Sequence, residues 1–455
     1  MKQLKPITNK LLWIFAVGQF GWSLLSGVVS NWMVYYYSGT PSEQNPNTGI
    51  FASGITQNPI LFKLTLFGLV LAVGRIFDAI TDPLIAGWSD RSNYKGGRRI
   101  PFLRAMAVPF SLCLVGLFVI PQTDSVVLND FALFVILLLF YLFMTMFCTP
   151  YNALIAELGD TQQHRINVST YISFTFIAGT SISFLLPNLA GMLEGSFGAK
   201  GGIRMAVAIM AAVACAAMLI PAFLIKERDY IDSKPSETKP FSSLVRTFSN
   251  GQFRRFVCSD VIYFFALTLF QTGLAFYETQ LMEIEDTYTF LLTATMTFIS
   301  VCLYPIVNIL AKKIGKKRLI IIGFFAYSGV FLITTLCGQG LVWGFIIAVS
   351  AAIPMAILGI LPQACVADVA ELTRLETKED RSGMFFAART FAFKMGQAIA
   401  MVVFTSVTVS GTKASYRTTA LIAFITCFIG ACIFFSYGEK KILGRIRELK
   451  GSDEI

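Results

Sequence analysis

The feature that constrains this chain most is a succession of apolar stretches, each long enough to cross a lipid bilayer. A transmembrane helix needs about 20 mostly apolar residues. Charged residues make up only 14% of the chain, which is too few for a water-soluble surface. The stretches predict an all-α membrane protein with twelve transmembrane helices in two six-helix halves. The expected spans lie near 11–37, 60–88, 101–121, 131–156, 168–193, 203–225, 255–281, 287–311, 319–338, 341–365, 384–408 and 418–438.

Lysine and arginine are concentrated in alternate connecting segments. With the N-terminus in the cytosol, the inner segments carry 29 of these residues and the outer segments carry five. Because basic residues collect on the cytosolic side of a membrane, we expect both termini to be cytosolic. No eukaryotic targeting signal is evident, so we expect the membrane to be the inner (plasma) membrane. The net charge of +10 is then a topology signal, and we expect no nucleic-acid partner.

Two short patterns occur once in each half of the chain. Gly97–Arg99 corresponds to Gly315–Lys317, and Pro150–Glu157 corresponds to Pro362–Glu371. Duplication of this kind is typical of transporters built from two repeated halves with the substrate site between them. The predicted organisation is an N-terminal half at 1–225, a cytosolic linker at 226–254, a C-terminal half at 255–438 and a cytosolic tail at 439–455.

The segment between spans two and three contains an aspartate followed by several arginines. The order Gly87-Trp-Ser-Asp90-Arg91, then Gly97-Arg98-Arg99, resembles the major facilitator signature. We expect Asp90, Arg91, Arg98 and Arg99 to act in gating, through an aspartate–arginine pairing that holds one gate state. The alternative is a solvated basic loop.

Span two contains two acidic residues, which are costly in a bilayer and usually functional. Asp78 and Asp82 are four residues apart and share one helix face, about 5–6 Å apart. Two carboxylates this close repel each other, and burial penalises their charge. A sodium ion held by both removes these penalties, and a shared proton removes part of them. The alternative is a structural ion pair between Asp78 and Arg75.

Span eleven contains Lys394, a basic residue that needs an acidic neighbour in a bilayer. We expect it to couple cation binding to transport by occupying or neutralising the site of Asp78 and Asp82, with Arg75 as a second coupling residue. The alternative for Lys394 is snorkelling to the inner interface. Arg389 lies one turn nearer the cytosol, and we expect it to snorkel.

Candidate substrate ligands are polar and aromatic side chains in spans one, four and seven. A sugar site combines an aromatic platform with hydrogen-bonding groups, and Gln19, Trp22 and Ser26 share one helix face. A tryptophan can instead belong to the interfacial belt, as we expect for Trp32. The candidates are Gln19, Trp22, Ser23, Ser26, Tyr151, Asn152, Asp260 and Gln271.

These residues give the chain a resemblance to the glycoside–pentoside–hexuronide:cation symporters, the group of the melibiose permease. The most specific string is Asp78-Ala-Ile-Thr-Asp82-Pro, and Ser89-Asp90-Arg91, Pro150–Leu154 and Lys394 before Gly396 accompany it. The resemblance spans nearly the whole chain and implies the major facilitator fold.

The resemblance also implies site residues. It makes Asp78 and Asp82 the cation ligands, Thr145 a further cation-site residue and Lys394 their neighbour. The sequence departs from the melibiose permease at Ser23, Cys148 and Ser173, where that protein has charged sugar-binding residues.

We therefore predict a Na⁺- or H⁺-coupled symporter of a sugar or glycoside that works by alternating access. Its partners would be the sugar, the coupling cation and membrane lipid, and it would act as a monomer. The alternatives are a lysolipid transporter of the related vertebrate branch and a non-transporting sugar sensor. We expect no enzyme activity and no cofactor, because no nucleophile–base set is visible and the chain has one histidine.

Overall fold

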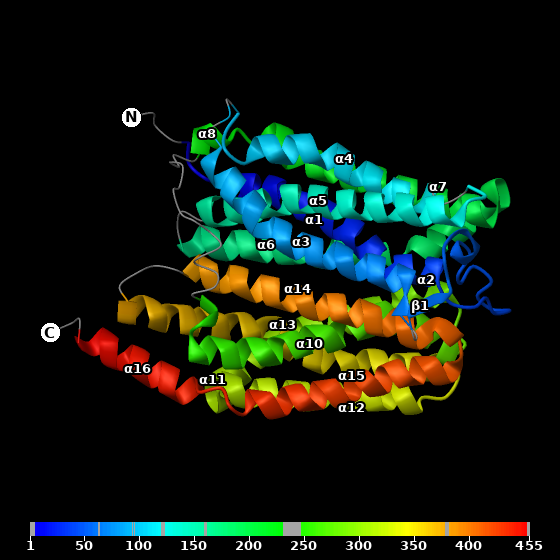
Figure 1. Cartoon of the computed structure of the whole chain (residues 1–455). Coiled ribbons are helices and arrows are strands. Elements are labelled where there is room, and N and C mark those ends of the chain that lie inside the picture. Colours follow the sequence, from blue (N-terminus) through cyan, green and yellow to red (C-terminus); the bar gives the residue numbers. More distant parts are fainter. Residues whose placement is uncertain are drawn as a thin grey trace. The chain divides into compact units, whose positions relative to one another are not determined.

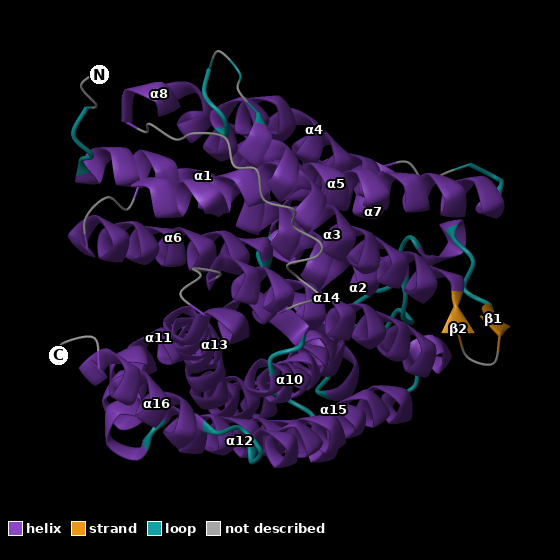
Figure 2. Cartoon of the chain, turned by 60° about the vertical axis from the view of Figure 1, so that its left-hand side comes forward, coloured by secondary structure: helices purple, strands orange, loops and turns teal. Residues whose placement is uncertain are grey.

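The described residues fold almost entirely into helices (Figures 1 and 2). The computed structural model describes residues 5–61, 64–92, 94, 96–119, 123–158, 162–230, 247–377 and 382–452. One short antiparallel hairpin joins β1 (Pro59–Leu61) to β2 (Leu64–Thr65). Most of the predicted cytosolic linker, residues 231–246, lies outside the described part.

The chain divides into two compact units. Unit 1 comprises Met1–Thr238 and Glu285–Phe290, and unit 2 comprises Lys239–Ile284 and Leu291–Ile455. The longer helices of unit 1 are α1 (Asn9–Val28), which continues through a π-helical turn η1 (Val29–Met33) into α2 (Val34–Tyr37), then α3 (Leu66–Arg91), α4 (Ile100–Val119), α5 (Val126–Leu158), α6 (Gln162–Ser183) and α7 (Leu186–Leu224). Short elements are η2 (Ala52–Gly54), α8 (Glu227–Tyr230) and η4 (Asp286–Tyr288).

Unit 2 contains a matching set of helices. They are α10 (Gly251–Phe276) with a π-helical turn η3 (Tyr277–Leu281), α11 (Thr289–Ile314), α12 (Lys316–Leu336), α13 (Leu341–Thr377), α14 (Ser382–Val407) with η5 (Thr408–Ser410), α15 (Lys413–Phe434) and α16 (Glu439–Ser452). The first two residues of α11 are grouped with unit 1.

The same packing pattern occurs in both units. In unit 1, α1 packs against α6 and α7, and α4 packs against α5 and α7. In unit 2, α10 packs against α14 and α15, and α12 packs against α13 and α15. These four helix pairs of each unit therefore correspond to one another at the same place in the helix order, as expected for a duplicated fold.

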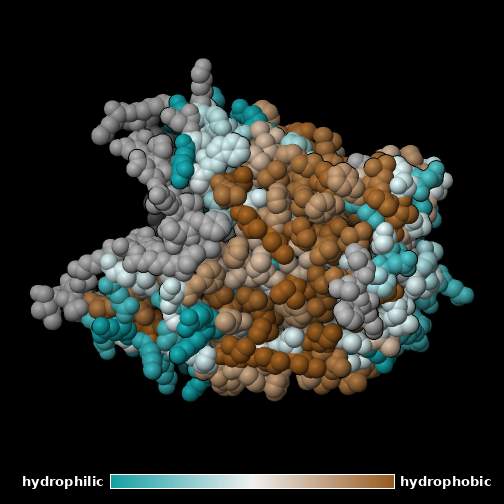
Figure 3. Space-filling view, viewed as in Figure 1, coloured by the Kyte–Doolittle hydropathy of each residue, from teal (hydrophilic) through white to brown (hydrophobic). Residues whose placement is uncertain are grey.

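The outer surface of the helices is apolar, as a lipid-facing surface must be. The side chains of Leu84, Phe298 and Val342 are 55%, 71% and 72% exposed. Exposing so much apolar surface is unfavourable in water but not in lipid. In Figure 3 apolar side chains cover the flanks of the helices, and hydrophilic ones gather toward the helix ends.

Ten helical segments of the described part are long and apolar enough to cross a membrane. Two further long helices, α3 and α6, are not among them. Helix α3 contains Arg75, Asp78 and Asp82, and α6 begins with a polar turn. The all-helical membrane fold is confirmed, and the count of twelve spans stays a prediction.

The main difference from the predicted spans lies around residue 185. The fifth span was expected to run to 193, but α6 ends at Ser183 and Leu186 already begins α7. Helix α7 is then interrupted at Gly198, whose φ is +70°. The apolar residues on both sides of this short connection hide the boundary from the sequence pattern.

Trp32 is a second difference. It was expected in the interfacial belt, but its side chain is fully buried and its indole N–H donates to the carbonyl of Ser183 at 2.8 Å. The prediction for Trp32 is wrong because this residue packs between α2 and α6 instead of facing lipid headgroups. It lies against Tyr35, Tyr36 and Phe184.

Candidate functional site

The two acidic residues of α3 face two threonines on α5. Asp78 is completely buried, and the hydroxyl of Thr145 donates to its Oδ1 at 2.7 Å. One turn along both helices, the hydroxyl of Thr149 donates to Oδ1 of Asp82 at 3.5 Å. A pair of carboxylates at i, i+4 thus faces a pair of hydroxyls at i, i+4, which concentrates oxygen atoms in an apolar bundle.

Thr81 is a third hydroxyl next to this pair. Its Oγ1 donates to the carbonyl of Asp78 at 3.1 Å and lies 3.5 Å from the hydroxyl of Thr145. The sequence analysis named Thr145 but neither Thr81 nor Thr149. The i, i+4 spacing of Thr145 and Thr149, which copies that of the aspartates, is the signal that could have identified Thr149.

Arg75 does not neutralise Asp78. Its guanidinium donates to the hydroxyl of Ser30 at 3.2 Å and lies over the ring of Tyr141, 5.1 Å from the centroid. Within the described residues no salt bridge joins Arg75 to Asp78, so the structural ion pair considered as an alternative is not formed. The oxygen atoms from which a cation site could be built are those of the two α3 carboxylates and of the threonine hydroxyls that face them.

Helix α14 of unit 2 contains the two basic residues predicted for span eleven. Lys394 is partly buried, and its coupling to the α3 carboxylates stays a prediction. Arg389 is 7% exposed and forms a bidentate pair with Asp260 of α10, with N–O distances of 2.7 and 3.0 Å. The predicted snorkelling of Arg389 is wrong, because the carboxylate of Asp260 holds the guanidinium inside the unit.

Asp260 was predicted as a substrate ligand, but its carboxylate is engaged by Arg389. Three phenylalanine rings surround the guanidinium at 5.6–6.0 Å from their centroids. These are Phe256, Phe264 and Phe393. Charge pairing and cation–π contact together make this a buried structural link between α10 and α14.

Tyr151 is also engaged by the protein itself. Its ring is fully buried and stacks on Phe15 at 4.2 Å. Its hydroxyl donates to the carbonyl of Phe15 at 2.7 Å and accepts from the N–H of Gln19 at 3.1 Å. One hydroxyl of α5 therefore bonds to two backbone groups of α1 that lie one helical turn apart.

The α1 candidates divide into packed and open groups. Ser23 is fully buried and its hydroxyl donates to the carbonyl of Gln19 at 2.7 Å, while Ser26 donates to the carbonyl of Ser23 at 3.2 Å. Both hydroxyls are therefore used by the helix. Trp22 is half-buried, and its indole N–H is buried without a hydrogen-bond partner. That donor is ready for an acceptor on a ligand.

The remaining candidates are more accessible. Asn152 on α5 and Gln271 on α10 are exposed, which leaves both amides available to a substrate. The side chain of Asp90 lies outside the described side chains, and Arg91 is exposed at the end of α3.

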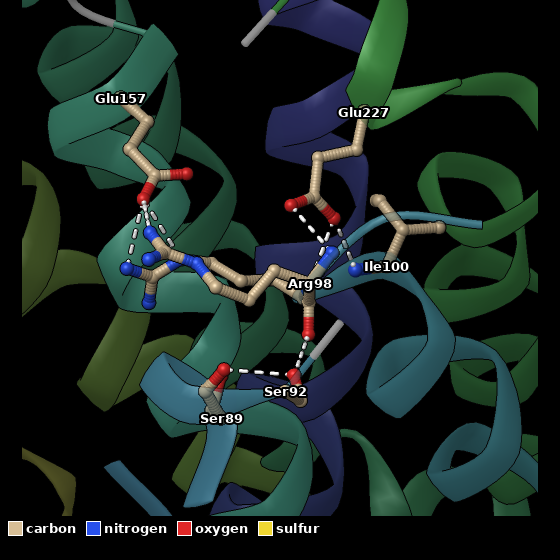
Figure 4. Close-up of polar contacts among 7 residues, drawn as sticks. Ser89, Ser92, Arg98, Ile100, Glu157 and Glu227 are labelled. Atoms are coloured by element: carbon tan, nitrogen blue, oxygen red, sulfur yellow. Dashed lines mark hydrogen bonds and ion pairs between the residues drawn. The ribbon is translucent and has the colours of Figure 1, made fainter. Parts of the chain in front are cut away.

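Arg98 and Arg99 lie in a network that encloses the start of α4 (Figure 4). Both guanidinium groups pair with the carboxylate of Glu157 on α5, and the Arg99 contact measures 2.8 Å. Glu227, 3% exposed, accepts the backbone N–H groups of Arg98, Arg99 and Ile100 at 2.8, 2.8 and 2.9 Å. A carboxylate in this position satisfies unpaired donors and complements the helix dipole.

Unit 2 contains a second network of the same design. Glu439 accepts the N–H groups of Lys316 and Lys317, at the start of α12, at 2.8 and 3.0 Å. Lys316 also pairs with Asp368 of α13. Each helix start follows a glycine with positive φ, +121° at Gly97 and +89° at Gly315, a conformation that favours glycine.

Glu227 and Glu439 are two further residues that the sequence analysis missed. They are 212 positions apart, the same separation that relates Pro150 to Pro362. This offset could have identified them, although each lies in a polar connection that resembles ordinary loop sequence. The gating role predicted for Arg98 and Arg99 stays a prediction, and the contacts described here are within unit 1.

Comparisons with known proteins agree with this architecture. The family model described as MFS/sugar transport protein matches residues 14–437. The uncharacterized symporter YnaJ of Bacillus subtilis is 23% identical over 97% of this chain and 94% of its own length. The sodium-dependent lysophosphatidylcholine symporter 1-A of Danio rerio is 21% identical over 78% of this chain and 72% of its own.

A solved structure shows the same fold. The crystal structure of a D-xylose-proton symporter superposes with a TM-score of 0.68 and 13% identity, over 95% of this chain and 98% of that chain. At this identity the likeness concerns the fold alone, which is that of the major facilitator superfamily.

Proposed function

The chain belongs to the MFS/sugar transport protein family of the major facilitator superfamily, and on this premise we propose that it is a cation-coupled symporter of a sugar or glycoside. It is a multi-pass membrane transporter and not an enzyme. We further propose that it is melibiose-permease-like, that its coupling cation is Na⁺ or H⁺, and that it lies in the plasma membrane with both termini in the cytosol.

One observation carries the proposal, the α3–α5 contact that joins Asp78 to Thr145 and Asp82 to Thr149. A fully buried carboxylate one turn from a second carboxylate is unfavourable unless positive charge is supplied. A sodium ion would take oxygen ligands from both aspartates and from the threonine hydroxyls. A proton would remove one negative charge and leave a carboxyl that can donate to its neighbour.

This site would couple cation binding to transport through electrostatics. Without a cation, the two charges disfavour passage through an occluded state. With the cation bound, the pair is neutral and the α3–α5 contact is held together by a shared ligand. Alternating access would then favour the loaded protein, and substrate movement would follow the cation gradient.

The proposed substrate class rests on side chains other than those of the cation site. Trp22 offers an aromatic face and an unpaired indole N–H, and Asn152 and Gln271 offer exposed amides. Aromatic faces with a few polar groups are typical of sugar sites. The family description names sugar transport, which favours the same substrate class.

A lysophospholipid is the second candidate substrate. The Danio rerio relative, named as a sodium-dependent lysophosphatidylcholine symporter, aligns over 78% of this chain. In that case the cation site would keep its role, and the transported molecule would be amphipathic.

The test is uptake by purified protein in proteoliposomes under imposed sodium or pH gradients. A panel of radiolabelled pentoses, hexoses and β-glycosides would be compared with labelled lysophosphatidylcholine. We expect a sugar to accumulate and Asp78→Asn to abolish the stimulation by the cation gradient. Gradient-driven sugar uptake that survives Asp78→Asn would refute the assigned cation site, and lysolipid uptake without sugar uptake would favour the second candidate.

Asp130→Asn is a matched control, because Asp130 lies on the same helix as Thr145. Its carboxylate accepts the backbone N–H of Thr56 at 3.1 Å and is only partly buried. The same change from carboxylate to amide should leave the cation stimulation in place. If both variants lose it, the effect of Asp78→Asn is structural.

A further inference from the structure

The last helix of unit 2, α16, separates apolar from basic side chains. Ile442, Ile446 and Leu449 recur at i, i+4 and i+7 and therefore share one face of the helix. Ile442 is 1% exposed, and α16 packs against α13. In Figure 3, which has the same view as Figure 1, hydrophilic side chains gather where α16 lies. The exposed basic residues of this helix are Lys440, Lys441, Arg445 and Arg447.

The end of α11 and the start of α12 add basic side chains at the same end of unit 2. Lys312 and Lys313 lie in the last turn of α11, and Arg318 lies in the first turn of α12. All three are exposed. The carboxylate of Glu439, the first residue of α16, accepts the first two backbone N–H groups of α12 at 2.8 and 3.0 Å. The starts of α12 and α16 are therefore in direct contact.

The carboxylates described at this end of unit 2 are already engaged. They belong, with their partners, to Asp368 (Lys316), Glu371 (Arg374), Glu376 and Glu448 (both Arg445) and Glu439 (the start of α12). Within the described residues, no hydrogen bond or ion pair involves the side chains of the basic cluster, which we define as Lys312, Lys313, Arg318, Lys440, Lys441 and Arg447. The described part of unit 2 thus leaves these six positive charges without a carboxylate partner.

The basic cluster begins where the lipid-facing apolar surface ends. Ile314 directly follows Lys313 and is 36% exposed, and Phe435 lies five residues before Lys440 and is 55% exposed. Lysine and arginine side chains near the end of a transmembrane helix extend to the membrane interface. The six charges therefore lie at the level of the lipid headgroups.

The chemistry of the basic cluster fits a phosphate group. Ammonium and guanidinium groups form charge-assisted hydrogen bonds with phosphate oxygens, and clusters of basic residues beside a membrane-spanning helix or on an amphipathic helix attract anionic lipids. A bias of basic residues toward one side of the membrane orients the chain. That bias alone requires neither a folded amphipathic helix nor charges that have no carboxylate partner.

We propose that the basic cluster is a binding site for the headgroups of anionic phospholipids. The apolar face of α16 holds the helix on unit 2, and the basic side chains bind the phosphate. The acyl chains lie along the exposed apolar side chains next to the cluster. This proposal goes beyond the proposed transport function and depends neither on the substrate nor on the cation site.

The test is lipid binding to the purified full chain in detergent, measured by native mass spectrometry. The protein would be titrated with phosphatidylglycerol, which is anionic, and with phosphatidylcholine, which is zwitterionic, with the same acyl chains. We expect phosphatidylglycerol to bind at least severalfold more tightly, and salt to reduce the difference by screening. Equal binding of the two lipids would overturn the proposal and would leave the cluster as a surface for an acidic protein.

The variant Lys440→Gln/Lys441→Gln/Arg447→Gln removes half of the charge of the basic cluster. Each basic residue near an anionic surface strengthens binding about fivefold, so this variant should bind phosphatidylglycerol about tenfold more weakly, or weaker still. The matched control Lys440→Arg/Lys441→Arg/Arg447→Lys keeps the charge and should bind like the wild type. Unchanged binding by the glutamine variant, or an equal loss in the control, would overturn the proposal.

Hydrogen–deuterium exchange of the wild type gives a second measurement, which requires no variant to fold. The full chain would be compared in nanodiscs of phosphatidylcholine with and without phosphatidylglycerol. The anionic lipid should slow the exchange of the backbone amides of α16 at least severalfold. Exchange of α16 that is the same in both nanodiscs would contradict the proposed site. Neither experiment requires a transported substrate, so failure of the proposed symport function would be recognised separately.

Discussion

The start of α4 offers a sharp test of how this fold is held together. In Glu227→Gln the carboxylate that accepts three backbone N–H groups becomes a neutral amide. The amide oxygen can still accept two of them, in the position of Oε2. The third, from Arg98, would face an NH₂ group instead of an acceptor.

The expected cost follows from counting these bonds. Three bonds to a charged acceptor at about 2 kcal/mol each are replaced by two neutral bonds at about 1 kcal/mol each. The loss in the free energy of unfolding is therefore about 4 kcal/mol. For a unit of this size it corresponds to a fall in Tm of about 8–16 °C.

Thermal unfolding in detergent measures this change when it is followed with a thiol-reactive dye, which would report the partly buried Cys113 and Cys215 of unit 1 and the buried Cys365 of unit 2. Glu439→Gln should lower Tm by a smaller amount, because that carboxylate accepts two N–H groups.

Asp229→Asn is the control, two residues along the chain from Glu227. Asp229 pairs with an exposed lysine, Lys5, whose pKa it raises by hydrogen bonding and charge, and such pairs contribute little to stability. If Glu227→Gln melts within about 2 °C of the wild type and of Asp229→Asn, the capping argument is wrong.

Two further predictions concern contacts between helices. Arg389→Met should lower the free energy of unfolding by about 3–5 kcal/mol, because it leaves the buried carboxylate of Asp260 unpaired. The Asp260→Asn/Arg389→Met double variant should regain at least half of this loss in the same melting assay, and no regain would argue against the ion pair. Gly179→Ala should destabilise the fold by about 1–3 kcal/mol through overpacking, because the new Cβ would lie 2.5 Å from the carbonyl oxygen of Phe20. Gly191→Ala is the control and should be neutral or slightly stabilising, because nothing lies within 4 Å of its new Cβ. Equal melting temperatures of the two variants would contradict this.

The apolar stretches predicted most of the fold because lipid imposes a simple rule on length and composition. Where that rule gives no contrast, the prediction failed. The boundary between α6 and α7 lies within continuous apolar sequence, so its position depends on a local turn. Trp32 is a residue type that is common in the interfacial belt, but its burial depends on the packing partners Tyr36 and Phe184.

The sequence analysis named the two α3 carboxylates and Thr145, but not the other hydroxyls beside them, those of Thr81 and Thr149. Asp78 and Asp82 are conspicuous because a charge in an apolar stretch is rare. The link between Arg389 and Asp260 joins residues 129 positions apart, and no local pattern indicates it. Glu227 lies in a polar connection where glutamate is common, so its local sequence does not distinguish it from a solvent-exposed residue, and the repeat offset to Glu439 is the one sequence signal.

The hydroxyl of Tyr151 has a mechanical consequence for the transporter. Because one hydroxyl of α5 bonds to two backbone groups of α1, sliding one helix along the other by a residue would break both of these hydrogen bonds. A motion that keeps them must therefore move α1 and α5 together near Tyr151.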